Sequence, residues 1–214
     1  MSDVGNAGNQ FSRGCGVALL LAGALTALIN LILTPLLHGQ HLPPEVVPST
    51  NIYFLRQSLS GLAALLLIFG CLGIHFVQRS ASGLFGAIAF LIAFVGGCLL
   101  FAVEFTDVFV LPAVARANAE TYLAIDKNVF MSIGFAFVAG LFAIGWLLLS
   151  VTAWRTRLLP RWAAITTFAG LCLVPLLQAS LGLPGGIAGN AVFGIGLIGL
   201  GFGVIKASPP FLNS

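Results

Sequence analysis

Six long apolar segments, separated by shorter polar stretches, constrain this chain more than any other feature. They run over residues 17–37, 59–77, 83–103, 129–152, 163–181 and 188–205. Each is close to the ~20 residues that a helix needs to cross ~30 Å of hydrocarbon at ~1.5 Å per residue. Because lipid offers the backbone no hydrogen-bonding partner, each segment is predicted to be a helix. The sequence therefore predicts an all-α, polytopic integral membrane protein that is a bundle of six transmembrane helices.

The composition argues against a separate soluble domain. Of the 214 residues, 59% are hydrophobic and 7% are charged, and the mean hydropathy is +1.08. Soluble domains usually contain about 25% charged residues. We therefore expect residues 1–214 to form a single membrane domain. The net charge of +3 is small and no dense basic block is present, so no nucleic-acid partner is expected.

The positive side chains predict which side of the membrane each loop faces. If the helices alternate in direction, Arg56, Arg116 and Lys127 fall on one side. The larger group on the other side comprises Arg13, Arg79, Arg155, Arg157, Arg161 and Lys206. Short loops that are rich in Lys and Arg stay in the cytoplasm. We therefore expect a multi-pass protein of the cell membrane, plasma or inner, with both termini in the cytoplasm (N-in/C-in).

One outer loop, over residues 104–128, carries a helical signal of its own. Pro112 is followed by several strong helix formers. Proline is favoured in the first turn of a helix because its missing N–H has no partner there in any case. The loop is therefore predicted to contain a short surface helix over residues 112–124.

Glycines in the last segment predict how the helices pack. Six of them fall on two roughly opposite faces at ~100° per residue, with Gly189, Gly196, Gly199 and Gly203 on one face and Gly194 and Gly201 on the other. In lipid, small residues allow helix backbones to approach closely. We therefore expect neighbours on both sides of this helix, and similar close approaches at Ala93/Gly97 and Ala136/Gly140.

Polar side chains gather in the half of the bundle that is expected to face outward. A polar group that faces lipid costs several kcal/mol unless it is satisfied, so these groups should face one another, water or a ligand. We therefore predict an outward-facing ligand pocket lined by Asn30, Thr34, His38, Arg56, Glu104, Gln178 and Asn190. Arg56 and Glu104 are expected to pair. The alternative is that water and headgroups satisfy the residues near helix ends, while Asn30 bonds across helices.

Metal, haem and catalytic chemistry have weaker signals in the sequence. The candidate metal ligands are His38, His41, Glu104 and Asp107. The H-x-x-H spacing is common by chance, so no metal site is predicted. His38 and His75 fall on opposite sides of the membrane, which argues against haem held by two histidines. No Gly-x-Ser-x-Gly motif marks a hydrolase, and no catalytic residue is predicted; quinone, haem and metal stay open as cofactors.

The loop between the fourth and fifth segments resembles that of a group of uncharacterised bacterial six-helix membrane proteins, a domain of unknown function. In that group the fourth helix ends in a basic loop with Leu-Pro-Arg, and the fifth helix follows at once. Here the matching residues are Leu159, Pro160 and Arg161. Trp162 replaces the small residue that usually follows. The resemblance implies a six-helix topology and no reaction.

The sequence as a whole favours a non-enzymatic membrane component. We expect an accessory or ligand- or lipid-binding subunit, with membrane lipids and other membrane subunits as partners. One alternative is a small transporter or channel, which would show a continuous water path from Asn30 to the level of Thr152. The other is a membrane oxidoreductase subunit that binds quinone or metal near His38 and Glu104.

Overall fold

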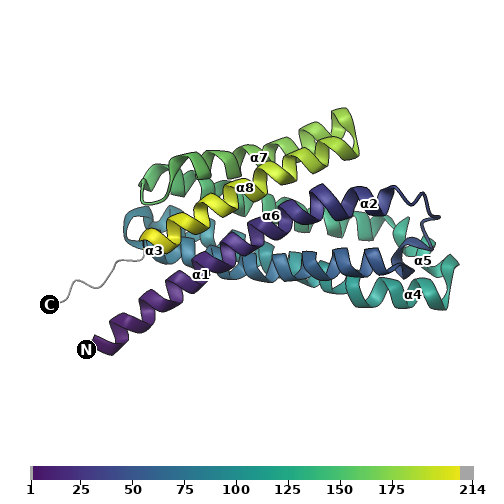
Figure 1. Ribbon diagram of the computed structural model, residues 1–214, viewed down its shortest axis with the longest axis horizontal. Helices are drawn as coiled ribbons and strands as arrows, with labels where there is room; N and C mark the ends of the chain where they lie inside the picture. The colour runs from purple at the N-terminus through teal and green to yellow at the C-terminus, as the bar shows by residue number, and fades with distance from the viewer. Residues whose placement is uncertain (1, 208–214) are drawn as a thin grey trace.

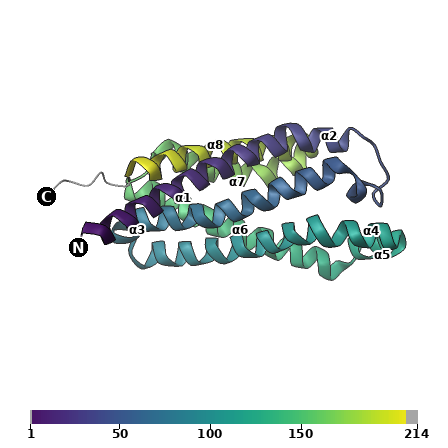
Figure 2. The same ribbon diagram turned by 60° about the horizontal axis from the view of Figure 1, so that its bottom comes forward.

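The computed structural model describes residues 2–207, apart from the side chains of residues 2–7, 9 and 126. All regular elements in this part of the chain are helices, which confirms the all-α prediction. The bundle is elongated, and the start of α1 and the end of α8 lie at the same end of it (Figures 1 and 2). Met1 and residues 208–214, which the single-domain prediction includes, lie outside the described residues.

Five helices are long and apolar enough to cross a membrane: Gln10–His38, Asn51–Ala117, Val129–Thr156, Arg161–Leu181 and Leu183–Ala207. The first consists of α1 (Ser2–Leu28), the π-helix η1 (Ile29–Leu33) and α2 (Thr34–His38). A 3₁₀ turn, η2 (Val47–Ser49), leads into the second, which consists of α3 (Asn51–Phe105), the π-helix η3 (Thr106–Val110) and α4 (Leu111–Ala117). The others are α6 (Val129–Thr156), α7 (Arg161–Leu181) and α8 (Leu183–Ala207).

The longest of these helices folds back on itself at Gly83. This residue has φ 55° and ψ −150°, a backbone conformation that is essentially restricted to glycine. The two halves of α3 run antiparallel. The ring centroids of His75 and Phe90 lie 4.3 Å apart, and further along the pair Gly97 lies against Ile68. The turn falls between the second and third apolar segments of the sequence.

Around the bundle, neighbours in space mostly follow chain order. The helix α1 packs against α3 and α8, α3 packs against α6, and α7 packs against α6 and α8. Gly70 contacts Leu19 of α1, whereas Gly96 contacts Phe142 of α6, so each half of α3 has its own partner. These contacts connect the helices in a closed ring, and the helices lie along the length of the bundle (Figure 2).

The glycines of α8 allow close contact on two faces, as the sequence predicts. A Cβ added at Gly196 would lie 2.4 Å from the backbone nitrogen of Thr167 in α7. On the other face, a Cβ at Gly194 would lie 2.7 Å from the carbonyl oxygen of Gly23 in α1. Because such distances leave no room for any side chain, glycine is required for helix contact on both sides of α8.

Two local predictions are wrong. Gly140 packs against no helix, because a Cβ added there would meet nothing within 4 Å; the close approach in α6 is made by Gly145, against Ala93. The single helix expected over residues 112–124 is instead divided between α4 and α5 (Ala119–Asp126). Asn118 separates the two in an extended conformation, and its side chain accepts a hydrogen bond from the Thr121 N–H at 3.0 Å. This Asn cap ends one helix and begins the next.

Each π-helix ends two residues before a proline. In η1 the Thr34 N–H donates to the Ile29 carbonyl, and in η3 the Leu111 N–H donates to the Thr106 carbonyl. Pro35 directly follows Thr34, and Pro112 directly follows Leu111. Because proline has no N–H and its ring clashes with the carbonyl four residues earlier, the preceding turn widens.

Candidate functional site

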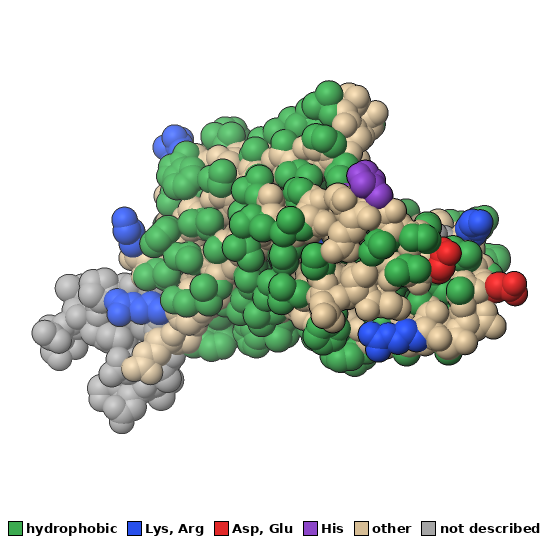
Figure 3. Space-filling model, turned by 45° about the vertical axis from the view of Figure 1, so that its right-hand side comes forward, with side chains coloured by type: hydrophobic (Ala, Val, Ile, Leu, Met, Phe, Trp, Pro, Cys, Tyr) green, Lys and Arg blue, Asp and Glu red, His purple; other side chains and the backbone are tan. Residues whose placement is uncertain are grey.

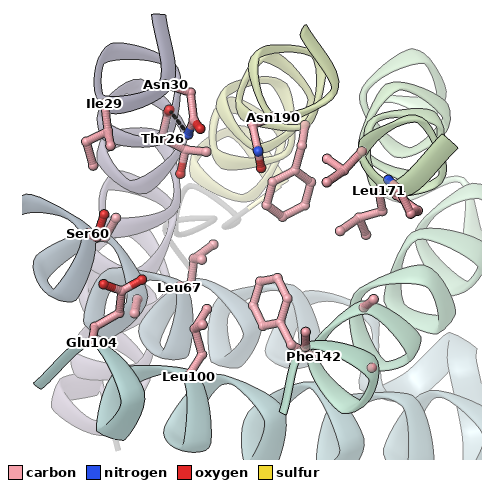
Figure 4. Close-up of a pocket in the computed structure, with 18 of the residues that line it drawn as sticks. Thr26, Ile29, Asn30, Ser60, Leu67, Leu100, Glu104, Phe142, Leu171 and Asn190 are labelled. Carbon is pink, nitrogen blue, oxygen red and sulfur yellow. Dashed lines mark hydrogen bonds between the residues drawn. The ribbon is translucent and has the colours of Figure 1, made fainter. Parts of the chain in front are cut away.

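A cavity of about 550 Å³ lies inside the ring of helices (Figure 4). Residues from α1, η1, α3, α6, α7 and α8 all contribute to its wall. Its polar lining residues are Thr26, Asn30, Arg56, Ser60, Glu104 and Asn190. The remaining lining residues are apolar, so the cavity combines a hydrocarbon-like interior with a few polar groups. This composition is typical of small-molecule and lipid sites.

Aromatic rings form the apolar end of the cavity. Phe142 and Phe193 line it, and their rings meet edge to face at 6.2 Å. Trp146 packs edge-on against Phe193 at 6.0 Å and is only 1% exposed. Rings in this geometry gain electrostatic stabilisation beyond the area that they bury. These three side chains therefore close the cavity towards the core of the bundle.

The cavity opens between α6 and α7. All buried residues of α6 lie between Gly145 and Ala153, and all buried residues of α7 lie between Ala163 and Gly170. Beyond these stretches both helices are more exposed, although Phe142 of α6 still contacts Gly96 and Val174 of α7 still contacts Gly189. Ala139 of α6 and Pro175 of α7 both line the cavity and are both exposed. The opening therefore faces sideways, towards whatever surrounds the bundle.

A hydrogen-bonded chain of side chains joins three helical segments beside the cavity. Arg56 Nε donates to Thr34 Oγ1 at 3.1 Å, and Arg56 Nη1 donates to Gln57 Oε1. Gln57 Nε2 in turn donates to Asp107 Oδ2 at 2.9 Å. The chain links α2, the start of α3 and η3, and Gln57 is only 4% exposed. It therefore fixes the position of the Arg56 guanidinium at the cavity wall.

Glu104 and Asp107 each have one buried carboxylate oxygen that receives no hydrogen bond from the described residues. These atoms are Oε2 of Glu104 and Oδ1 of Asp107. In Figure 4, Glu104 lies beside Ser60 at one side of the cavity. A buried carboxylate oxygen without a donor is costly, which marks this wall as the place where a ligand would gain most.

The two asparagines of the cavity use their N–H groups within their own helices. Asn30 Nδ2 donates to the Thr26 carbonyl at 2.9 Å, and Asn190 Nδ2 donates to the Gly186 carbonyl at 3.0 Å. The Thr26 hydroxyl likewise donates to a backbone carbonyl of α1, at 2.8 Å. Each bond uses one N–H of an amide, or the hydroxyl of Thr26, inside a helix. Each asparagine keeps its oxygen lone pairs and a second N–H, and Thr26 keeps its oxygen lone pairs.

The structure brings together four of the seven side chains that the sequence placed in the pocket: Asn30, Arg56, Glu104 and Asn190. Thr34 is buried behind them as the partner of Arg56. His38 is exposed and bonds the Thr34 carbonyl through Nδ1 at 2.9 Å, and Gln178 is exposed on α7; neither lines the cavity. The expected ion pair between Arg56 and Glu104 is not formed, because Arg56 donates to Thr34 and Gln57 instead.

The four candidate metal ligands do not form a cluster. In the described part of the chain, no three His, Cys, Asp or Glu side chains are grouped so that they could hold a metal ion. His38 and His41 are both exposed, whereas Glu104 and Asp107 lie inside the bundle. The geometry therefore adds no support for a metal at this end of the protein.

Sequence reasoning missed Gln57, Phe142 and Phe193 as site residues. Gln57 stands next to Arg56 and two residues before the apolar segment 59–77, and this polar pair at the start of a long apolar helix is a signal that could have been used. The two phenylalanines carry no such signal, because the chain contains 18 phenylalanines and most of them face outward or into other contacts. No protein-family model matches the chain, and neither a curated protein nor a solved structure is significantly similar to it.

Proposed function

We propose that this chain is a non-enzymatic integral membrane protein that holds the apolar part of a membrane lipid in the cavity between its helices. The observation that carries the proposal is a cavity of about 550 Å³ with apolar walls and a polar rim, open sideways between α6 and α7. A lipid could enter this opening from the bilayer without leaving its hydrocarbon surroundings. It remains a prediction that the protein is an accessory subunit with other membrane subunits as partners. Kinship with the six-helix group of unknown function also remains a prediction.

The proposal includes six membrane crossings. The helical stretch Asn51–Ala117 has 67 residues, which at ~1.5 Å per residue is about three times the ~30 Å of a bilayer core. The reversal at Gly83 divides it into two crossings. The short helix α5 and the end of α4 would then lie at the outer membrane surface.

The charge distribution supports an orientation with both termini in the cytoplasm. Arg79 precedes the turn at Gly83, and Arg155, Arg157 and Arg161 surround the turn from α6 to α7 at the same end. In Figure 3, Lys and Arg lie at both ends of the bundle, whereas the acidic side chains in view all lie at the end away from this turn. The positive-inside rule then assigns this end to the cytoplasm.

The orientation is tested by labelling single cysteines in a chain whose four native cysteines are replaced. Arg116→Cys and Arg157→Cys are both at exposed positions. A membrane-impermeant maleimide should label the first in intact cells and the second only after permeabilisation. Labelling of both from the same side would contradict the proposed topology.

Lipid binding is tested by filling the cavity. Gly140 lines the cavity and has open space around it, so Gly140→Leu should fill the space without displacing a neighbouring helix. Gly134→Leu is the matched control, because Gly134 lies on the same helix, is equally open and does not line the cavity. Native mass spectrometry should show bound lipid on the wild type and on Gly134→Leu, and little on Gly140→Leu. Equal retention by all three proteins would refute the proposal.

The geometry favours binding over passage through the bundle. Thr152, at the level where a transport path would have to end, lines a separate cavity of about 280 Å³ with Ser82 and Arg155. Trp146 and Leu149, which are 1% and 2% exposed, lie along α6 between the two cavities. A buried apolar layer of this kind separates the larger cavity from the basic end. No observation specifically favours the oxidoreductase alternative.

A further inference from the structure

The polar rim of the cavity offers several acceptors. Asn30, Asn190 and Thr26 each donate to a backbone carbonyl of their own helix and keep the lone pairs of their side-chain oxygens. Pro175 adds a further acceptor, because a proline cannot donate to the carbonyl of Leu171 four residues earlier, and both residues line the cavity. A ligand that donates hydrogen bonds would find partners along this rim.

The charged cluster at this rim has one more carboxylate than it has cations. Arg56 is the cation, and the acids are Glu104, which lines the cavity, and Asp107, which lies behind the lining residues. Asp107 accepts from Gln57 through Oδ2, although its Oδ1 is buried without a donor in the part of the chain that the structure describes. Glu104 Oε2 is likewise buried without a donor there, and Glu104 is the acid that a ligand in the cavity can reach. An unpaired carboxylate inside a membrane bundle is unfavourable, and a positive charge on the ligand would relieve that cost.

We propose that the amphiphile bound in the cavity has a primary ammonium head that donates to Glu104, while its hydrocarbon chain lies against Phe142 and Phe193. This inference rests on the proposed lipid-binding function. A primary ammonium supplies three N–H donors and one positive charge, so it can donate to the unpartnered oxygen of Glu104 and balance the extra carboxylate of the cluster. A trimethylammonium head supplies the charge without the N–H groups, and a phosphoglycerol head supplies neither.

Two sources share this chemistry. A phosphatidylethanolamine carries a phosphate as well, and the Arg56 guanidinium, which has five N–H groups and uses only Nε and Nη1 in the bonds described above, could receive it. A long-chain alkylamine carries the ammonium alone. Competition of dodecylammonium with bound phosphatidylethanolamine would support recognition through the ammonium alone, whereas competition by phosphatidylethanolamine only would support an added contact to the phosphate.

The test compares headgroups on one acyl-chain composition. Native mass spectrometry of the purified full chain is titrated with phosphatidylethanolamine, its N,N-dimethyl derivative, phosphatidylcholine and phosphatidylglycerol. Because a hydrogen bond to a charged group is a strong one, we expect phosphatidylethanolamine to bind about tenfold more tightly than phosphatidylcholine, with the dimethyl lipid between them. This comparison uses the wild-type protein and so does not depend on the folding of any variant.

Substitutions then assign the preference to one side chain. Glu104→Gln should lower the ratio of the two affinities to about one, while Glu120→Gln, at an exposed position on α5, should leave it unchanged. Equal binding of the two lipids to the wild type, or a preference that survives in Glu104→Gln, would overturn the inference. If Gly140→Leu still excludes lipid in that case, lipid binding stands and only the ammonium head is wrong; if Gly140→Leu retains lipid, the proposed function fails as well.

Discussion

Replacing Gly196 by alanine should force α7 and α8 apart. An added Cβ would lie 2.4 Å from both the backbone nitrogen and Oγ1 of Thr167, and 3.4 Å is the lower limit of ordinary contact. The facing backbone must therefore retreat by about 1 Å, and a gap of that size forfeits up to about half of the dispersion energy of each affected atom pair. Overpacking of this kind costs about 1–3 kcal/mol in the free energy of unfolding.

The control is Gly134→Ala on α6, where an added Cβ meets nothing within 4 Å. Both variants gain the same helix propensity, so the difference between them isolates the steric term. We expect the free energy of unfolding of Gly196→Ala to be about 1–3 kcal/mol lower than that of Gly134→Ala. It is measured by circular dichroism as the mole fraction of SDS is increased. Equal stability of the two variants would refute the close packing of α8 on α7.

Two further predictions concern α3. Gly83→Ala should destabilise the protein by about 1–3 kcal/mol, because alanine is strained at φ 55° and ψ −150° even though the surrounding space is open; SDS unfolding should show no such loss for Gly14→Ala, at an open helical position. Gln57→Leu should cost about 1–3 kcal/mol, because it removes the donor to Asp107 inside the bundle. In the same assay, Gln57→Leu in an Asp107→Asn background should cost less, and equal costs in both backgrounds would contradict this link.

The general architecture of this protein follows from its sequence because lipid leaves the backbone so few options. Runs of apolar residues near the length of a membrane crossing are sufficient to predict helices. The periodicity of glycine in α8 also predicts contact on both faces, since that property depends on one helix alone. The close approach predicted at Ala136/Gly140 is wrong, because a pair of small residues can border a cavity as readily as a neighbouring helix.

The site is only partly predictable, and the reason is rotation about the helix axis. Spacing along the sequence gives the expected depth of a side chain in the membrane, so Asn30, Arg56, Glu104 and Asn190 could be assigned to the outer half of the bundle. His38 and Gln178 have a suitable depth but face away from the cavity. Whether Arg56 meets Glu104 or Gln57 depends on the relative rotation of three helical segments. No pattern within one segment encodes that rotation.

The π-helix η1 contains one residue more than a regular helical turn would need. Each residue of a regular α-helix turns the chain by ~100°, and the wider turn of η1 absorbs the surplus residue. If the same residues wound as a regular α-helix, Thr34 would be turned by about 100°, away from the guanidinium that it accepts from. The polar wall of the cavity thus depends on the winding of a single turn, which the apolar character of the segment does not determine.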